Sequence, residues 1–202
     1  PEGFATALAR QPPPAPPPQP PVPWQPSVKR DENAKPVIVI DPGHGGIDGG
    51  AVGAANVVEK DLVLAVSRQL RQLLAATGRY DVRMTRATDT FVSLDARVAF
   101  SRAAEASLFV SLHADSVADA ALAQKAHGAT IYTLSETATN SAAQRLADKE
   151  NAADARVGLS ASSLSESEQI KSILSDLVHR ETQNFSMKFK KLVVERMGRD
   201  RL

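Results

Sequence analysis

Cysteine is absent from the 202-residue sequence, which excludes disulfide bonds, thiolate metal sites and a cysteine nucleophile. Aromatic residues make up only 4% of the chain, and the formal net charge of +1 gives no sign of a nucleic-acid partner. The sequence has no apolar run long enough for a membrane-spanning helix. It also has no recognisable signal peptide and starts with proline rather than methionine, so we expect a fragment of a longer precursor.

Most of the prolines lie in residues 11–26, QPPPAPPPQPPVPWQP. Such a run favours the extended polyproline II conformation and cannot build a helix or a central strand. We expect a disordered linker over residues 1–35 that acts as a spacer to an upstream module, and a docking site for a proline-binding module is the alternative. One folded domain is expected over residues 36–202. The composition of the chain, 43% hydrophobic and 23% charged, is ordinary for a soluble globular protein.

Beyond the linker, strand-like and helix-like patterns alternate. Short, largely apolar strands are predicted over residues 37–40, 80–85, 107–112 and 128–134. A helix is predicted from Glu59, because apolar side chains recur at helical spacing until Gly78. Ser93 is the expected N-cap of a second helix, and residues 181–198 are predicted to form a last one. This order predicts an α/β fold: a single domain with a mostly parallel or mixed sheet flanked by helices, and a helical insertion at residues 139–178 after the fourth strand.

Two histidines lie where predicted strands end. His44 lies in the glycine-rich loop DPGHGGIDGG after the first strand, and His113 directly follows the third. Sites in parallel sheets form at the carboxyl ends of the strands, so we expect the two imidazoles to meet. Glu59 opens a helix, and its carboxylate can point back to the same edge. Two imidazoles and a carboxylate are a common hydrolytic zinc set. From the pattern alone, hydrogen-bonded loop histidines are an equal alternative.

Four segments then carry a family resemblance. In chain order they are IVIDPGHGGIDGGAVG, VVEKDLVLAVSRQL, VRMTRATDTFVSLDARVAFSR and SLFVSLHADS. Together they closely resemble the zinc-dependent N-acetylmuramoyl-L-alanine amidases with which bacteria split septal peptidoglycan. The resemblance covers residues 37–134 and is looser to about residue 198. It implies that His44, Glu59 and His113 bind Zn2+, and that the substrate is the amide bond between the muramic acid lactyl group and L-alanine.

The family takes its proton-transferring carboxylate from a glutamate in a segment resembling V-E-x-G-x-x-x-N, which this sequence lacks. We therefore expect a chain truncated at its C-terminal end, with that glutamate beyond Leu202. Such a chain would bind zinc but be weak or inactive as a hydrolase, since losing a general acid or base costs about 10²–10⁴-fold. Glu195 is expected to be a solvated surface charge. Asp115 is expected to orient a ligand or the loop, and Asp41 either supports a ligand's second nitrogen or has a structural role in the turn.

The remaining candidates have ordinary explanations. His127 is expected in a loop and His179 on or at the end of a helix, neither of them as a metal ligand. Arg86 and Arg97 either contact carboxylates of the peptide substrate or pair with nearby aspartates, and the sequence does not decide between these roles. The aspartates concerned are Asp89 and Asp95.

The insertion at residues 139–178 is polar, alanine-rich and largely helical in pattern. Cell-division members of the family carry a comparable insertion, whose helix covers the active site until a partner protein removes it. The resemblance implies that a carboxylate from this segment could occupy the open position on zinc. Glu150 is the first candidate for this autoinhibitory ligand, and Glu166 and Glu168 are others. An ordinary helical pair packed on the sheet is the alternative.

The function expected from the resemblance is zinc-dependent hydrolysis of peptidoglycan, for daughter-cell separation and wall remodelling, in the periplasm of a Gram-negative bacterium. Peptidoglycan is the expected partner, together with a LytM-type activator protein if the insertion covers the site. We expect a monomer, with no nucleic-acid partner and no membrane span. The alternatives are a zinc peptidase that cuts the stem peptides of peptidoglycan, and a catalytically inactive domain that binds the wall or an activator.

Overall fold

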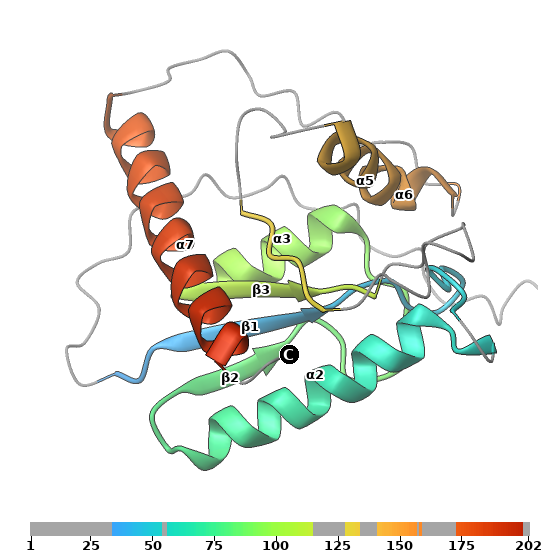
Figure 1. The fold of residues 1–202 in the computed structure, drawn as a ribbon, viewed down its shortest axis with the longest axis horizontal. Coiled ribbons are helices and arrows are strands. Elements are labelled where there is room, and N and C mark those ends of the chain that lie inside the picture. The colour runs from blue at the N-terminus through green and yellow to red at the C-terminus, as the bar shows by residue number, and fades with distance from the viewer. Residues whose placement is uncertain are drawn as a thin grey trace, which may run out of the picture. The chain divides into compact units, whose positions relative to one another are not determined.

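A three-stranded parallel sheet lies at the centre of the domain in the computed structural model, which describes residues 34–53, 56–114, 128–133, 141–156, 158 and 173–199. Strand β1 (Val37–Pro42) lies between β2 (Asp81–Met84) and β3 (Leu108–Leu112), as Figure 1 shows. It pairs in parallel with both neighbours. The carboxyl ends of the three strands therefore lie at one edge of the sheet.

The core forms between this sheet and helix α2 (Glu59–Ala76), which packs against β1 and β2 (Figure 1). Strand β1 is the most buried strand because it has a neighbour on each side, and Val39 and Ile40 have no exposed surface. Full burial of an aliphatic side chain contributes about 1.5–3 kcal/mol to folding. The core cluster contains Ile38, Ile40 and Val82, with Leu70, Leu74, Tyr80, Met84, Leu108 and Leu112 packed against it. This packing holds β1 in place and, with it, the start of the loop that follows.

Local sequence signals explain where the first two helices begin. Helix α2 begins at Glu59, as predicted, and Glu59 and Asp61 place negative charge in its first turn, where free N–H groups favour it. Helix α3 (Leu94–Ala103) begins directly after Ser93. The hydroxyl of Ser93 accepts a hydrogen bond from the N–H of Ala96, so the predicted N-cap is confirmed.

The predicted insertion contains two helices in its described part, α5 (Ser141–Asn151) and the short α6 (Ala153–Arg156). Helix α7 (Ile173–Arg199) includes the predicted last helix but begins earlier, at Ile173. Among the described residues, no helix is both long and apolar enough to cross a membrane. Residues 1–33 lie outside the described ranges, so the linker stays a prediction.

The fourth predicted strand, residues 128–134, is not a strand over its described part, residues 128–133. The β-branched and aromatic residues of GATIYTL favour an extended chain, but a strand forms only when its backbone groups pair with a neighbour. Within the described residues, this segment pairs with no strand of the sheet, whose order is β2-β1-β3. Thr133 instead lies near α7, where its hydroxyl is 3.5 Å from Sδ of Met187.

Candidate metal centre

His44, Glu59 and His113 lie together at the carboxyl edge of the sheet. His44 follows β1, Glu59 is the first residue of α2, and His113 follows β3. One potential ligand atom from each residue lies within 4.8 Å of the other two. Oε2 of Glu59 is 3.2 Å from Nε2 of His44, and Oε1 of Glu59 is 3.2 Å from Nδ1 of His113. The structure thus brings together three residues that are far apart in the sequence.

The loop that carries His44 has a backbone conformation that few residues tolerate. His44 has a φ of 57°, and the two glycines after it also have positive φ. A non-glycine residue in such a region costs about 1–3 kcal/mol and persists only where its surroundings hold it. A Cβ on Gly43 would lie 2.5 Å from Cε1 of His113, and one on Gly50 would lie 2.6 Å from Cδ2 of His44. Glycine at these positions lets the loop and the imidazoles come this close.

Glu59 is buried and ionised. Its side chain has no exposed surface, and its carboxylate accepts hydrogen bonds from the N–H groups of Ala51 at 2.8 Å and Ala114 at 2.7 Å. Burial alone raises the pKa of Glu59, but the close contacts with His113 and His44 and the hydrogen bonds from these two N–H groups outweigh burial. They hold the pKa of Glu59 well below its usual range. The cluster therefore contains a fixed negative charge at neutral pH.

Asp48 orients the ring of His44. Oδ2 of Asp48 lies 2.8 Å from Nδ1 of His44, and both side chains are almost completely buried. Burial lowers the pKa of His44, but the contacts with Glu59 and Asp48 outweigh it and raise that pKa. Carboxylates only accept hydrogen bonds, and the contact of Nδ1 with Asp48, at 2.8 Å, is shorter than that of Nε2 with Glu59, at 3.2 Å. A neutral His44 is therefore best placed with its proton on Nδ1 and the lone pair of Nε2 toward the cluster.

The spacing of the three side chains fits a metal ion. Ligands held about 2.0–2.1 Å from a tetrahedral zinc ion lie about 3.3–3.4 Å apart. Each imidazole nitrogen lies 3.2 Å from one of the two oxygens of Glu59, and one ligand atom from each residue lies within 4.8 Å of the other two. Within the part of the chain that the structure describes, the buried Nε2 of His44 has no hydrogen-bond partner. A buried polar atom needs a partner, and a cation beside an ionised carboxylate would supply one. The cluster is therefore compatible with a metal ion.

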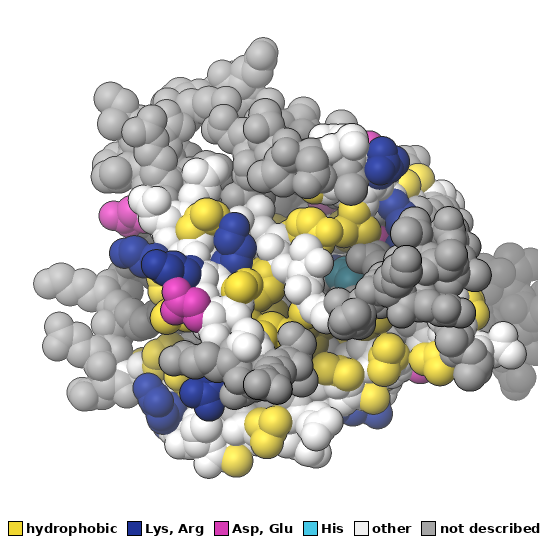
Figure 2. Space-filling view, in the orientation of Figure 1, with side chains coloured by type: hydrophobic (Ala, Val, Ile, Leu, Met, Phe, Trp, Pro, Cys, Tyr) yellow, Lys and Arg dark blue, Asp and Glu magenta, His cyan; other side chains and the backbone are white. Residues whose placement is uncertain are grey.

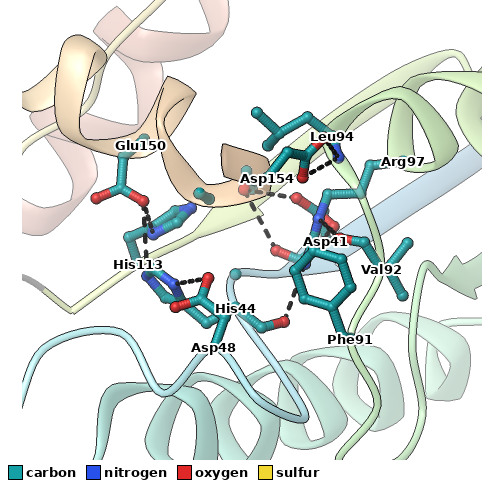
Figure 3. Close-up of a pocket in the computed structure, with 13 residues that line it drawn as sticks. Asp41, His44, Asp48, Phe91, Val92, Leu94, Arg97, His113, Glu150 and Asp154 are labelled. Atoms are coloured by element: carbon teal, nitrogen blue, oxygen red, sulfur yellow. Dashed lines mark hydrogen bonds and ion pairs between the residues drawn. The ribbon is translucent and has the colours of Figure 1, made fainter. Parts of the chain in front are cut away.

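Glu150 of α5 faces the same cluster. Its Oε2 lies 3.5 Å from Nε2 of His44 and 3.4 Å from Nδ1 of His113. Figure 3 shows its carboxylate pointing toward the two imidazoles. These distances exceed the usual 2.7–3.2 Å of N–H···O hydrogen bonds but are close to the spacing of two ligands on one ion, about 3.3–3.4 Å. The residue singled out first in the insertion thus lies beside both imidazoles.

A small pocket lies between the cluster, α3 and α6 (Figure 3). Its charged side is lined by His44, Asp48, His113 and Glu150, and its apolar side by Phe91, Val92 and Leu94. Asp154 of α6 also borders it and accepts a hydrogen bond from the N–H of Leu94, at 3.1 Å and 3.2 Å to its two oxygens. Only a small area of histidine surface is visible on the face drawn in Figure 2, in keeping with the burial of His44.

None of the described hydrogen bonds joins Asp41 to a ring nitrogen of the cluster. Its carboxylate accepts hydrogen bonds from the hydroxyls of Thr85 and Ser111 and from the guanidinium of Arg97. These contacts favour the structural role among the two left open for Asp41. The carboxylate beside Nδ1 of His44 is that of Asp48.

The two arginines also differ from expectation. Arg86 and Arg97 are buried, at 3% and 6% exposure, and donate hydrogen bonds to backbone carbonyls of the loop after β1. Arg97 forms its ion pair with Asp41 rather than with a residue of its own helix. Asp89 forms its ion pair with Lys60 at 2.7 Å, and its negative charge also acts on Arg86, whose pKa burial lowers and Asp89 raises. Both side chains bind the loop because its carbonyls offer several hydrogen-bond acceptors close together.

Several further candidates lie outside the described residues, namely Asp115, His127, Glu166 and Glu168. His179 lies within α7, but its side chain is not described. Glu195 is exposed on α7, where its carboxylate is 3.9 Å from Nζ of Lys191. That is the surface position expected for it.

Comparison with known proteins settles the family. Residues 38–186 match the Amidase_3 family, described as N-acetylmuramoyl-L-alanine amidase. The chain belongs to this amidase family. It is 40% identical over 164 residues to the N-acetylmuramoyl-L-alanine amidase AmiC of Escherichia coli O6:H1, a match that covers 81% of this chain and 38% of that protein. It is 41% identical to AmiC of Neisseria meningitidis serogroup B, covering 82% of this chain and 38% of the relative.

A solved relative of this amidase-family chain is the N-acetylmuramoyl-L-alanine amidase AmiC2 of Nostoc punctiforme. The match has 40% sequence identity and a TM-score of 0.41, and covers 43% of this chain and 47% of that one. The matches to the AmiC proteins of Escherichia coli and Neisseria meningitidis cover well under half of the length of those relatives.

Two residues of this amidase-family site escaped the sequence reasoning, Asp48 and Asp154. Asp48 lies in the same loop motif as His44, four residues later, and an acid that close to a candidate ligand was an available signal. Asp154 had no such signal, because its contact with Leu94 joins residues 60 positions apart.

Proposed function

We propose that His44, Glu59 and His113 hold one zinc ion, and that the protein to which this chain belongs cleaves the amide bond between the muramic acid lactyl group and L-alanine in peptidoglycan. The observation that carries the proposal is the cluster itself. Two imidazole nitrogens lie 3.2 Å from the two oxygens of one buried carboxylate, in a chain of the amidase family.

Zinc suits this donor set, because two imidazoles and one carboxylate leave a fourth position open, as in other catalytic zinc sites. When bound, zinc would polarise the amide carbonyl and make a water molecule acidic enough to attack at neutral pH. The same donors also tolerate other first-row ions, so the proposal of zinc is tested by metal analysis.

The residues of the chain prepare the site for this chemistry. Asp48 holds the proton of His44 on Nδ1, which keeps Nε2 free to bind. The backbone N–H groups of Ala51 and Ala114 hold both oxygens of Glu59 toward the cluster. Phe91 and its apolar neighbours line the pocket on the other side and would exclude water from a bound peptide stem.

Product analysis tests the reaction. Purified peptidoglycan is incubated with the zinc-loaded chain, and the released material is identified by mass spectrometry. Stem peptides with a free L-alanine amino group are the expected product. The rate is expected to be low, since no V-E-x-G-x-x-x-N segment is present in residues 1–202, so the identity of the product decides. Shortened stem peptides would instead indicate a peptidase.

The proposal includes autoinhibition by Glu150. An oxygen that lies 3.4 Å and 3.5 Å from the two imidazole nitrogens can take the fourth position on the ion. The hydrogen bond from the N–H of Leu94 to Asp154 gives the α5–α6 segment a second attachment, on α3. A LytM-type activator would act by displacing this segment. We place this activity in the periplasm of a Gram-negative bacterium, in a protein that separates daughter cells.

Glu150→Gln tests the inhibitory contact. Glutamine keeps the size of the side chain but removes the charge that favours a metal ion. We expect the variant to release stem peptides faster than the wild-type chain. Asp148→Asn is the matched control, because Asp148 lies on the same helix and, among the described hydrogen bonds, its carboxylate accepts only from the exposed Gln144. Equal rates for both variants and the wild type would reject Glu150 as the inhibitory ligand.

A further inference from the structure

Two buried arginines bind the backbone of the loop that carries His44. Arg86 donates from Nε to the carbonyl of Pro42 at 2.9 Å and from Nη2 to that of Gly43 at 2.7 Å. Arg97 donates from Nη1 to the carbonyl of Pro42 at 2.8 Å and from Nη2 to that of His44 at 2.9 Å. Three successive carbonyls are thus bound by two guanidinium groups, at the point where the backbone takes its rare conformation.

The same two guanidiniums reach the segments that carry the other two cluster residues. Nη2 of Arg86 also donates to the carbonyl of Lys60 at 2.9 Å, and Lys60 directly follows the cluster glutamate. Nη1 of Arg97 donates to Oδ1 of Asp41 at 2.7 Å. Oδ2 of Asp41 in turn accepts from the hydroxyl of Ser111 at 2.8 Å, and Ser111 lies in β3 two residues before His113. One connected set of hydrogen bonds therefore joins all three segments.

This arrangement is a costly way to hold a fold together. Burial, and then the neighbouring charge of Arg97, lower the pKa of Arg86, which means that the two cations are held close together against repulsion. Buried charges lose their hydration, and apolar packing would stabilise the same region as well or better. Arginine offers something that apolar residues and lysine lack: several N–H donors in one planar group, at fixed angles to one another.

We propose that Arg86 and Arg97 are positioning residues of the metal centre: they hold the loop after β1, the start of α2 and the end of β3 in the arrangement that the metal requires. The inference rests on the proposed zinc function. Neither arginine reaches the metal ligands' side chains in any described contact, so both act through the backbone and, for Arg97, also through the carboxylate of Asp41. Their removal would let the three segments move apart and would raise the free energy of assembling the site.

The test compares Arg86→Lys and Arg97→Lys with Arg83→Lys. Arg83 is an exposed residue of β2 that pairs with Asp81, so it controls for the chemical change. Zinc dissociation constants are measured by chelator competition on variants whose far-UV circular dichroism shows a folded chain, and the absorption spectrum of bound Co(II) reports ligand geometry. We expect about 10- to 100-fold weaker zinc binding and a changed Co(II) spectrum for the first two variants only. Lower thermal stability with an unchanged dissociation constant and spectrum would overturn the proposal.

A milder variant and a metal-free measurement keep the test decisive. If neither lysine variant folds, Asp41→Asn removes the charge that Arg97 contacts. Weaker zinc binding by that variant supports the proposal, and wild-type affinity overturns it. If the wild-type chain itself binds no zinc, the proposed zinc function is refuted, but the positioning role of the arginines is still open to a test. Hydrogen exchange of the Gly45 and Asp48 amides, which close the loop on itself, then decides. Faster exchange of these amides in Arg86→Lys and Arg97→Lys than in Arg83→Lys supports the positioning role, and equal exchange in the three variants refutes it.

Discussion

Replacing Asp48 with asparagine is expected to weaken zinc binding by about 10- to 100-fold, although Asp48 is not one of the proposed ligands. Oδ2 of Asp48 contacts Nδ1 of His44 at 2.8 Å, and Oδ1 accepts from the N–H of Gly50 at 3.2 Å. Asparagine has only one oxygen, so its amide NH2 must face one of these two donors. Either the N–H of Gly50 loses its acceptor, or His44 moves its proton to Nε2, the atom that should bind the metal.

The size of the effect follows from these contacts. A hydrogen bond to a charged group contributes about 1.5–3 kcal/mol and a neutral one about 0.5–1.5 kcal/mol. Loss of the charge on Asp48 therefore costs about 1–1.5 kcal/mol, which is close to a tenfold change in affinity. A buried donor left without an acceptor adds about 1 kcal/mol or more, and this brings the change toward 100-fold.

The assay is competition for zinc between the chain and a chromophoric chelator, at fixed pH and ionic strength. Asp81→Asn is the matched control, because it changes the net charge equally but alters an exposed pair with Arg83 on β2. Circular dichroism checks that both variants are folded. If Asp48→Asn and Asp81→Asn bind zinc with the same affinity, the carboxylate does not set the orientation of His44, and the reasoning fails.

Three further predictions concern the same cluster. Gly50→Ala should weaken zinc binding at least tenfold, because its Cβ would lie 2.6 Å from Cδ2 of His44 and 2.7 Å from Oε2 of Glu59. Gly78→Ala, with a similar φ of 68° and no atom near its Cβ, should lower stability by about 1–2 kcal/mol but leave the affinity unchanged; equal losses of affinity would contradict the steric argument. In the metal-free chain, the raised pKa of His44 stabilises the fold below pH 6.5 and loses this effect as pH rises through that pKa, whereas the lowered pKa of Glu59 stabilises it above pH 4.5. Urea unfolding with chelator present should therefore show the cluster's largest contribution to the free energy of unfolding between about pH 4.5 and 6.5. Zinc affinity should instead fall as pH drops below the pKa of His44, and a flat zinc affinity across this range would count against imidazole ligation. Zinc at 100 times its dissociation constant should stabilise the chain by about 2.7 kcal/mol, seen as a higher midpoint of thermal unfolding that excess chelator reverses; a midpoint that zinc leaves unchanged would mean that it does not bind the folded chain.

The elements that the sequence predicts well are those whose signals are local. Helix α2 begins at Glu59 and α3 begins after its cap at Ser93, because periodicity and capping depend on neighbouring residues. The prediction of a strand over residues 128–134 is wrong over the described residues 128–133 for the opposite reason. Its residues favour an extended chain, but pairing with a neighbour is a property of the whole sheet.

The sequence predicts the three residues of the cluster but not the residues that hold them in place. His44 and His113 lie just after strands, and the topology of a parallel sheet brings such positions to one edge. The contact from Asp48 depends on positive φ angles in the loop, which composition alone does not specify. Arg86 and Arg97 carry the side chains least expected in a protein interior, so no pattern distinguishes them from surface arginines.

The most direct test of the account is the zinc content of the purified chain, measured by elemental analysis beside His113→Ala. We predict one zinc ion per wild-type chain and a sharp loss in the variant, with circular dichroism showing that both are folded. A well-folded wild-type chain without zinc, or a variant that retains the full amount, would contradict the claim that His44, Glu59 and His113 form the metal site.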